Sequence, residues 1–402
     1  MKKTNGTMKI LIILPVLLFV LLAGWIGGTE WKQRQSEGGA VSKAARDTLA
    51  SSIAQQDTEE NVKESNSQEV LTVADETKES SVNQEQNPVV HLLFAGDILL
   101  STHVTTAYDK SGGINGVLDE GMQEEISKAD IFMANQEFPF SNRGSAAPDK
   151  QFTFHLNPDR VSMMNEIGVD IVTIANNHTL DYGTDALLDT CTTLDGAGIR
   201  YVGAGPDMNR AKQLETMEVN GKTFGFLAAS RVYPDANWVA NSKKPGMVSG
   251  YDPTILLEEI RKARSICDYL VVYVHWGVER EDKPKEYQRQ LGQQLIDAGA
   301  DIIVGSHPHV LQGVEYYKGK PICYSLGNFI FGSSIPKTAL MRAEVNFDNN
   351  TTTLSLVPGT SGAGFTKALT KPEEVKGFYQ YFQGLSFGIT IDDNGVIHND
   401  GN

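Results

Sequence analysis

Five short apolar segments between residues 89 and 309 each end in a small polar motif. Segments with helical periodicity lie between them, and this alternation is typical of a mostly parallel β-sheet covered by helices on both faces. The carboxyl ends of parallel strands meet at one edge of a sheet, where ligands of α/β proteins bind. The pattern therefore predicts that these motifs converge in space: Gly96-Asp97, Asn135-Gln136-Glu137, Asn176-Asn177-His178, His275-Trp276-Gly277 and His307-Pro308-His309.

The side chains in these motifs are those of a metal site. They supply carboxylate, amide and imidazole groups without a thiol, a set that suits Mn, Fe or Zn. Two such divalent ions close together would act jointly on a phosphoryl group. The candidate residues are Asp97, Glu137, Asn177, His178, His275, His307 and His309.

Each motif also has a structural interpretation. A lone histidine at a strand end is more often hydrogen-bonded than metal-bound, and Gly96-Asp97 alone also suits a turn. Of the eight histidines, His91, His155 and His398 receive the structural interpretation, and four of the other five lie in the motifs. His307-Pro308-His309 is the sharpest signal, because one rigid proline separates two imidazoles that can face the same edge.

The N-terminal segment predicts a single membrane anchor over residues 1–28. Lys2, Lys3 and Lys9 precede an apolar run from Ile10 to Gly28, which is long enough to span a bilayer. The lysines favour a cytoplasmic N-terminus, so the rest of the chain would lie outside the cell membrane. A cleaved signal peptide is the alternative, although the run ends without a good cleavage site.

Residues 29–88 are rich in Ser, Glu, Gln, Asn and Lys, and such a segment cannot bury enough apolar surface to fold. This composition predicts a disordered linker, either a plain spacer or a tether that lets the domain reach a polymer. One extracytoplasmic α/β domain is then expected over residues 89–402. Within it, Asn220-Gly221 predicts a β-hairpin, and segments 314–329 and 341–359 predict two more that add antiparallel strands.

Charge and cysteine content narrow the possible partners. The formal net charge is −15, and a negative surface repels phosphate backbones, so nucleic acid is not an expected partner. Cys191, Cys267 and Cys323 are widely spaced within apolar segments, which predicts buried free thiols rather than a disulfide framework.

Four residues near strand ends are candidates to line a substrate pocket: Arg231, Trp276, Glu279 and Asn328. Arg231 could receive a phosphate or a carboxylate through both arms of its guanidinium group. Loop stabilisation is the alternative role for all four.

Six segments around these residues resemble, in order, the CapA family of poly-γ-glutamate capsule synthesis: FAGDILLS, ANQEFPFS, IANNHTLDYG, VHWGVE, GADIIVGSHPHVLQGVE and YSLGNFIF. The resemblance covers residues 89–335, and the family's domain belongs to the calcineurin-like metallophosphoesterase superfamily. It therefore implies a four-layer α/β/β/α sandwich of the metallo-dependent phosphatase type, with a site for two divalent ions.

The resemblance also implies a role for each site residue. Asp97 and His309 would hold one ion, and a second ion would be bound by Asn177, His275 and His307. Glu137 stands where the superfamily has a bridging Asp. His178 would be the general acid that protonates the leaving oxygen.

The chain departs from the superfamily pattern at two places. The first motif of the superfamily is Asp-x-His, whereas Ile98 and Leu99 follow Asp97 here, so His103 would have to fold back to supply the missing ligand. Thr179 replaces the acidic residue that normally follows the Asn-His pair. Asp181 is the candidate to orient His178 instead.

Three functions are compatible with these observations. The first is a component of capsule or surface-polymer biosynthesis or export, with an anionic polymer and other capsule-synthesis membrane proteins as partners. The second is a general metal-dependent phosphoesterase of the cell envelope with a phosphoester substrate. The third is a polymer-binding module that keeps the fold without chemistry.

Overall fold

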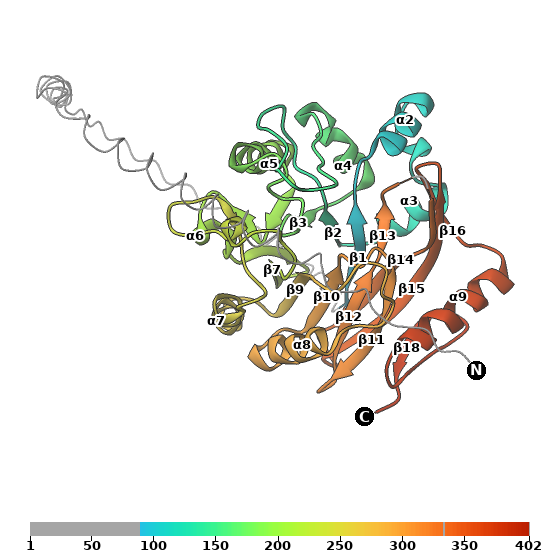
Figure 1. The fold of residues 1–402 in the computed structure, drawn as a ribbon. Coiled ribbons are helices and arrows are strands. Elements are labelled where there is room, and N and C mark those ends of the chain that lie inside the picture. The colour runs from blue at the N-terminus through green and yellow to red at the C-terminus, as the bar shows by residue number, and fades with distance from the viewer. Residues whose placement is uncertain (1–88, 333, 402) are drawn as a thin grey trace, which may run out of the picture. The chain divides into compact units, whose positions relative to one another are not determined.

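The structure, a computed structural model, describes residues 89–332 and 334–401 (Figure 1). The predicted anchor and linker lie outside the described residues, so both stay predictions. In the described ranges, no helix combines the length and the apolar character needed to cross a membrane.

The first sheet has ten strands and combines a parallel half with an antiparallel half. The parallel half consists of β1 (Val89–Ile98), β2 (Ile131–Gln136), β3 (Ile171–Thr173) and β4 (Arg200–Val202), with the short β13 (Asn328–Ile330) beside the end of β1. The antiparallel half consists of β14 (Ser334–Asn346), β15 (Thr351–Gly362), β16 (Phe365–Ala368), β17 (Ile389–Ile391) and β18 (Val396–Asn399). The hairpin predicted over residues 341–359 is confirmed as β14 and β15.

The second sheet has six strands in the order β11-β12-β10-β9-β7-β6. Its parallel centre is β7 (Lys222–Ser230), β9 (Tyr269–His275), β10 (Ile302–Ser306) and β12 (Lys320–Leu326), and its antiparallel edges are β6 (Glu215–Val219) and β11 (Leu311–Tyr317). Asn220 and Gly221 both have positive φ, which matches the right-handed twist of the β6–β7 hairpin. A separate pair joins β5 (Ala204–Gly205) to β8 (Gly246–Met247).

The two sheets pack face to face across an apolar core. Successive side chains of a strand point to opposite faces. On β2, Met133 accordingly joins the core between the sheets with Phe94 and Phe226, while Phe132 joins a second core under the helices. Helices α3 (Glu120–Ser127), α4 (Ser162–Ile167) and α5 (Thr184–Ala197) contribute to that second core.

A third core lies on the outer face of the second sheet, under α7 (Thr254–Ala263) and α8 (Glu286–Ala298). Figure 1 shows α4 and α5 beside β2 and β3, and α7 and α8 beside β9 and β10. The described residues therefore form helix, sheet, sheet and helix layers, as predicted. Helix α2 (Thr102–Ser111) follows β1, the short α6 (Met208–Ala211) follows β5, and α9 (Pro372–Leu385) packs against β11 and β15. All three cysteines are buried free thiols, as predicted.

The strand registers bring the polar motifs of both sheets to one rim. Asp97 pairs with Asn135 across β1 and β2, and His275 pairs with Ser306 across β9 and β10. Gly96 permits a close approach at this rim, because a β-carbon there would lie 1.8 Å from the carbonyl oxygen of Gly327. The rim is therefore the place where the two sheets present their functional residues together.

Candidate metal centre

Three imidazoles converge on one buried carboxylate at this rim. The Nε2 atoms of His309, His275 and His178 lie 3.8, 3.9 and 3.9 Å from Glu137 Oε1. These histidines come from different segments, after β10, at the end of β9 and after β3, while Glu137 follows β2. Separate strand ends therefore meet at Glu137, as the sequence motifs predicted.

Several polar atoms of this cluster are buried without a hydrogen-bond partner. Asp97 Oδ2, both carboxylate oxygens of Glu137 and His307 Nδ1 have no hydrogen-bond partner in the part of the chain that the structure describes. An unpaired buried polar group is costly, and it is most costly when it is charged. These atoms are carboxylate oxygens and an imidazole nitrogen, the donors that Mn, Fe and Zn accept. The cluster fits one or more divalent ions.

The potential ligand atoms form three groups within 4.8 Å of one another. One group is Asp97, Glu137 and His309, and another is Glu137, His275 and His307. Glu137 belongs to both groups, so its carboxylate lies between the two sets of potential ligands. The third group joins Glu279 to His307 and His309, so Glu279, a predicted pocket residue, lies where it could also bind an ion.

A chain of amide side chains holds the cluster in place. Asn135 Nδ2 donates to Asp97 Oδ1 at 2.8 Å, and Asn176 Nδ2 donates to Asn135 Oδ1 at 2.9 Å. Asn177 Oδ1 lies 2.8 Å from His275 Nε2, so these two predicted ligands point at the same place. His275 Nδ1 is 3.0 Å from Ser306 Oγ, which fixes the orientation of that ring.

His178 is oriented by Asp181, as predicted. Its Nδ1 lies 2.7 Å from Asp181 Oδ2, which also accepts from the backbone N–H of Phe154 at 2.7 Å. The ring of Phe154 lies tilted against His178, with 4.5 Å between the ring centroids. Thr179, in the place of the usual acidic residue, instead donates its hydroxyl to backbone carbonyls of the same loop.

Lys150 completes this arrangement, and no sequence pattern predicted its role. Its ammonium group donates to Asp181 Oδ1 and to the Asn177 carbonyl, and it lies 3.1 Å from His178 Nδ1. A single lysine in the long loop between β2 and α4 belongs to no recognisable pattern. Only the folded loop shows that it neutralises the buried Asp181.

Burial and neighbouring charges shift the pKa values of the cluster in opposite directions. Burial, and then Asp97, raises the pKa of Glu137 well above its usual value. Burial and the neighbouring imidazoles lower the pKa of His275 well below its usual value, and they lower that of His307 to about 4. Burial also lowers the pKa of His178, although Asp181 opposes the change. The neutral form of these three imidazoles is therefore favoured at pH 7, and metal binding requires that form.

His309 behaves differently from the other imidazoles. Burial by itself would lower its pKa, but Glu137 and Asp97 outweigh burial and raise it to about 10. In the absence of an ion, His309 is therefore protonated, and its positive charge faces these two carboxylates. The backbone also singles out this motif, because His307 and His309 both have positive φ, at 103° and 58°. Such strained conformations concentrate at functional sites.

Three predicted residues lie elsewhere or act differently. The structure does not bring His103 to the cluster, because α2 begins at Thr102 and leaves His103 exposed on its surface. The predicted pocket role of Trp276 is wrong. Its ring is fully buried in the core under α7 and α8, and its Nε1 donates to the Tyr324 carbonyl at 2.8 Å. Asn328 is mostly buried, and its Oδ1 lies 2.8 Å from His309 Nδ1, so it orients that ligand.

Arg231 does reach the rim. It follows β7 directly, and its backbone N–H donates to the carbonyl of His275 at 2.8 Å. Its guanidinium carbon lies 4.2 Å from the ring centre of Tyr287 and 5.1 Å from that of Tyr251.

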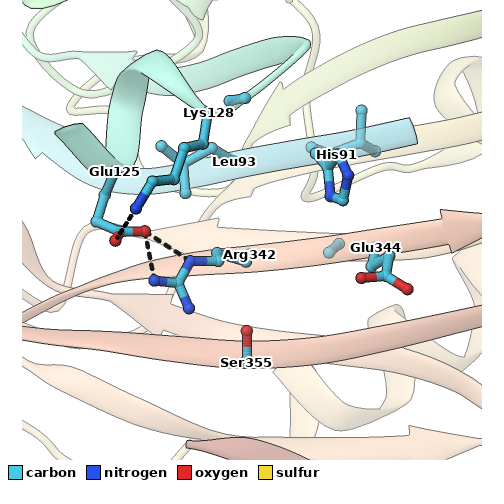
Figure 2. A pocket seen from close by; sticks show the side chains of 10 residues that line it. His91, Leu93, Glu125, Lys128, Arg342, Glu344 and Ser355 are labelled. Atoms are coloured by element: carbon cyan, nitrogen blue, oxygen red, sulfur yellow. Dashed lines mark hydrogen bonds and ion pairs between the residues drawn. The ribbon is translucent and has the colours of Figure 1, made fainter. Parts of the chain in front are cut away.

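A second acid–base cluster lies at the other end of β1, on the outer face of the first sheet (Figure 2). Figure 2 shows Glu125 bonded to both Lys128 and Arg342, with His91, Glu344 and Ser355 on the neighbouring strands. The cavity between them measures about 430 Å³. His91 is an exposed strand residue here, in agreement with its structural interpretation.

Comparison with known proteins finds similarity over the part of the chain that carries these residues. The sequence profile of the family described as bacterial capsule synthesis protein PGA_cap matches residues 91–333, a range that contains every motif of the centre. The capsule biosynthesis protein CapA of Bacillus anthracis is 32% identical over 72% of this chain and 72% of its own length. The PGA biosynthesis protein CapA of Bacillus subtilis (strain 168) is 32% identical over 64% of this chain and 67% of its own length.

Among solved structures, the NAD nucleotidase NadN of Haemophilus influenzae aligns with 76% of this chain and 64% of that chain, at 11% identity and a TM-score of 0.43. The family profile covers more than half of this chain, and the Bacillus anthracis relative matches more than two thirds of it. The resemblance inferred from the six motifs is thereby confirmed, and the chain belongs to the PGA_cap family of bacterial capsule synthesis proteins, which includes CapA.

Proposed function

We propose that this chain is a membrane-anchored, extracytoplasmic component of the synthesis or export of poly-γ-glutamate or a related anionic surface polymer. We further propose that its buried centre holds two divalent ions and performs phosphoesterase-like hydrolysis. Membership of the capsule synthesis family supports the first part. The convergence of His178, His275 and His309 on the unpartnered carboxylate of Glu137 carries the second.

The two ligand groups that share Glu137 suggest how the ions are held. Asp97 and His309 would bind one ion, while His275, His307 and the side-chain oxygen of Asn177 would bind the other. Mn, Fe and Zn are the metals that suit these donors. Bound divalent ions would polarise a phosphoryl oxygen and stabilise the charge that develops during its displacement.

The chain's own proton donor would be His178. Its Nε2 faces Glu137, and its Nδ1 faces both Asp181 and Lys150. An ionised carboxylate can only accept, so the 2.7 Å contact with Asp181 places a proton on Nδ1 of His178. His178 acts as a general acid when Nε2 is protonated as well, and Asp181 favours this doubly protonated form while burial opposes it. From Nε2 the proton can pass to a leaving oxygen.

The location of the domain belongs to the same proposal. The lysines before the apolar segment at residues 10–28 favour a cytoplasmic N-terminus, which would place the centre outside the membrane, near exported polymer. Protease added to intact, wall-stripped cells should release a fragment that begins near residue 89. Full protection of the domain from protease would contradict this topology.

The enzymatic part is tested with the full-length chain purified in detergent and loaded with Mn, Fe or Zn. Wild-type protein should hydrolyse an aryl phosphodiester, and Asp97→Ala should lose metal and activity together. Arg143→Ala is a suitable control, because Arg143 pairs with Asp189 on the exposed surface and contacts none of the ligands. A metal-replete wild type without turnover would contradict the hydrolase proposal.

One outcome would favour a polymer-binding module instead. His178→Ala should be introduced into cells and the surface polymer measured. If the metal-replete protein shows no turnover and polymer levels stay normal in the mutant, a scaffold or binding role is favoured. The sequence departure at Ile98 and Leu99 motivates this alternative, although Glu279 adds a carboxylate near His307 and His309.

A further inference from the structure

Arg231 occupies a defined place beside the metal centre. It is the first residue after β7, whose last residue, Ser230, pairs with His275. The hydrogen bond from its backbone N–H to the His275 carbonyl continues the strand pairing by one step. The backbone of Arg231 is therefore fixed to the strand that carries a candidate ligand.

The guanidinium group of Arg231 is held by aromatic rings and has no acidic partner. It contacts the rings of Tyr287 and Tyr251, an arrangement in which the ring faces attract the cation. Tyr251 is itself braced by an edge-to-face contact with Tyr233. Across residues 89–332 and 334–401, no carboxylate forms an ion pair with Arg231 and no acceptor bonds its guanidinium nitrogens.

Tyr287 connects this arginine to the histidine motif. Its hydroxyl oxygen accepts from the N–H of Gly277 at 3.1 Å. Gly277 in turn packs on Pro308, because a β-carbon at residue 277 would lie 2.8 Å from Pro308 Cγ, and its φ of 100° also favours glycine. The turn that begins at Gly277 then carries Glu279 into the group with His307 and His309. Arg231 therefore belongs to the same rigid rim as the candidate ligands.

The charge of Arg231 lies beside exposed apolar surface. Tyr251 is 56% exposed and Val278 is 39% exposed, although both are large apolar side chains. The chain as a whole has a net charge of −15 and repels a polyanion at long range. A polyanionic ligand consequently needs local cations at the rim, and a guanidinium fork without an acidic partner matches the two oxygens of a carboxylate.

We propose that Arg231 is a recognition residue that receives a carboxylate of the anionic polymer beside the metal centre, with Tyr251 and Tyr287 holding its guanidinium group. The methylene groups between successive carboxylates of a γ-linked glutamate chain would contact the exposed Tyr251 ring and Val278. This inference rests on the proposed function, since it assigns the polymer to the same rim. It adds the residue that binds a carboxylate of the polymer.

The test uses the full-length, metal-loaded chain in detergent and a short, fluorescently labelled oligomer of γ-linked glutamate. Fluorescence anisotropy gives the dissociation constant. Arg231→Ala should weaken binding by about tenfold to a hundredfold, because it removes charge-assisted hydrogen bonds to a charged ligand. Arg231→Lys should show a smaller loss, since lysine keeps the charge but not the two-armed fork.

Arg261→Ala is the matched control. Arg261 is exposed on α7, so its removal changes the net charge by the same amount without touching the rim. It should bind the oligomer like the wild type. Equal binding by wild type and Arg231→Ala would overturn the inference, and so would equal losses in Arg231→Ala and Arg261→Ala or an oligomer that does not bind the wild type.

Two further measurements separate this inference from the proposed function and from another ligand. Metal content and the thermal midpoint of Arg231→Ala should match those of the wild type. Retained phosphodiester turnover with oligomer binding unchanged in Arg231→Ala would overturn the recognition role alone. A poly(glycerol phosphate) oligomer that binds more tightly than the glutamate oligomer, and loses that binding in Arg231→Ala, would overturn the assignment to a carboxylate.

Discussion

Strand β1 carries an acid–base cluster near each end, and the two clusters satisfy their charges in opposite ways. Near its start, His91 lies beside the surface network in which Glu125 bonds both Arg342 and Lys128 (Figure 2). Near its end, Asp97 belongs to a buried cluster in which both oxygens of Glu137 have no hydrogen-bond partner among the described residues. Strand β1 therefore connects a surface cluster whose charges are paired to a buried cluster whose central carboxylate has no hydrogen bond from the described residues.

The pKa of each central glutamate reflects this difference. Burial would raise the pKa of Glu125, but hydrogen bonds from Arg342 and Lys128 outweigh burial and lower it. For Glu137, burial and Asp97 together raise the pKa well above its usual value. The comparison teaches that mixed charge alone does not mark a site. A site is marked where buried ligand atoms converge and the protein leaves them unpaired.

The largest effect is expected from removing both histidines of the His307-Pro308-His309 motif. His307→Ala combined with His309→Ala takes ligands from every group in the centre, so bound Mn, Fe or Zn should fall from one or two ions per chain to almost none. Elemental analysis of the purified chain measures this. His91→Ala, at the other end of β1, is the control and should retain metal. Unchanged metal content in the double mutant would remove the distinction between the two clusters.

The next effect concerns proton donation by His178. His178→Ala should lower turnover of an aryl phosphodiester by about a hundredfold to ten-thousandfold, the usual contribution of a general acid, with metal content intact. The loss should shrink for esters whose leaving groups are very acidic, because these need no proton. A loss that is equal for all leaving groups would argue against the general-acid role.

Lys150→Met should destabilise the fold substantially. Asp181 is fully buried, and Lys150 is only 15% exposed, so the mutation leaves an uncompensated buried charge that typically costs about 3 kcal/mol or more. The free energy of unfolding in urea measures this loss. Turnover should fall as well, because Lys150 holds Asp181, the residue that orients His178, and the Asn177 carbonyl. Wild-type stability would show that Asp181 is compensated in another way.

Acidification should destabilise the metal-free chain before ordinary carboxylates titrate. The pKa of His307 is lowered from 6.5 to about 4, so the unfolded chain binds that proton first, and stability falls as the pH drops from 6.5 toward 4. The raised pKa of His309 acts in the opposite sense, since its contribution is complete below 6.5 and disappears as the pH rises through about 10. Urea midpoints in a chelator across this range test both signs, and wild type with bound metal is the comparison.

The smallest effect is expected at the surface cluster. Arg342→Ala should cost at most about 1 kcal/mol of stability, because the Arg342 side chain is 41% exposed and surface ion pairs contribute little. Metal content should not change. A loss as large as that of Lys150→Met would mean that the surface network is less dispensable than its exposure suggests.

Much of the centre could be predicted because its geometry follows from strand periodicity. Polar motifs at the carboxyl ends of parallel strands must meet at one rim, so Asp97, Glu137, His275 and His307 could be brought together without coordinates. The same periodicity could have excluded Trp276. It follows His275 directly, and successive residues of an extended segment face opposite sides.

The sequence by itself determined the alternation of strands and helices, the hairpin at Asn220-Gly221 and the set of candidate ligands, because these depend on local patterns. Only the tertiary structure decided that Lys150 neutralises Asp181, that Glu279 approaches His307 and His309, and that Arg231 lies on two tyrosine rings. The physical reason is that these contacts join loops far apart in sequence. Their positions depend on how the two sheets pack, and no short-range pattern records that packing.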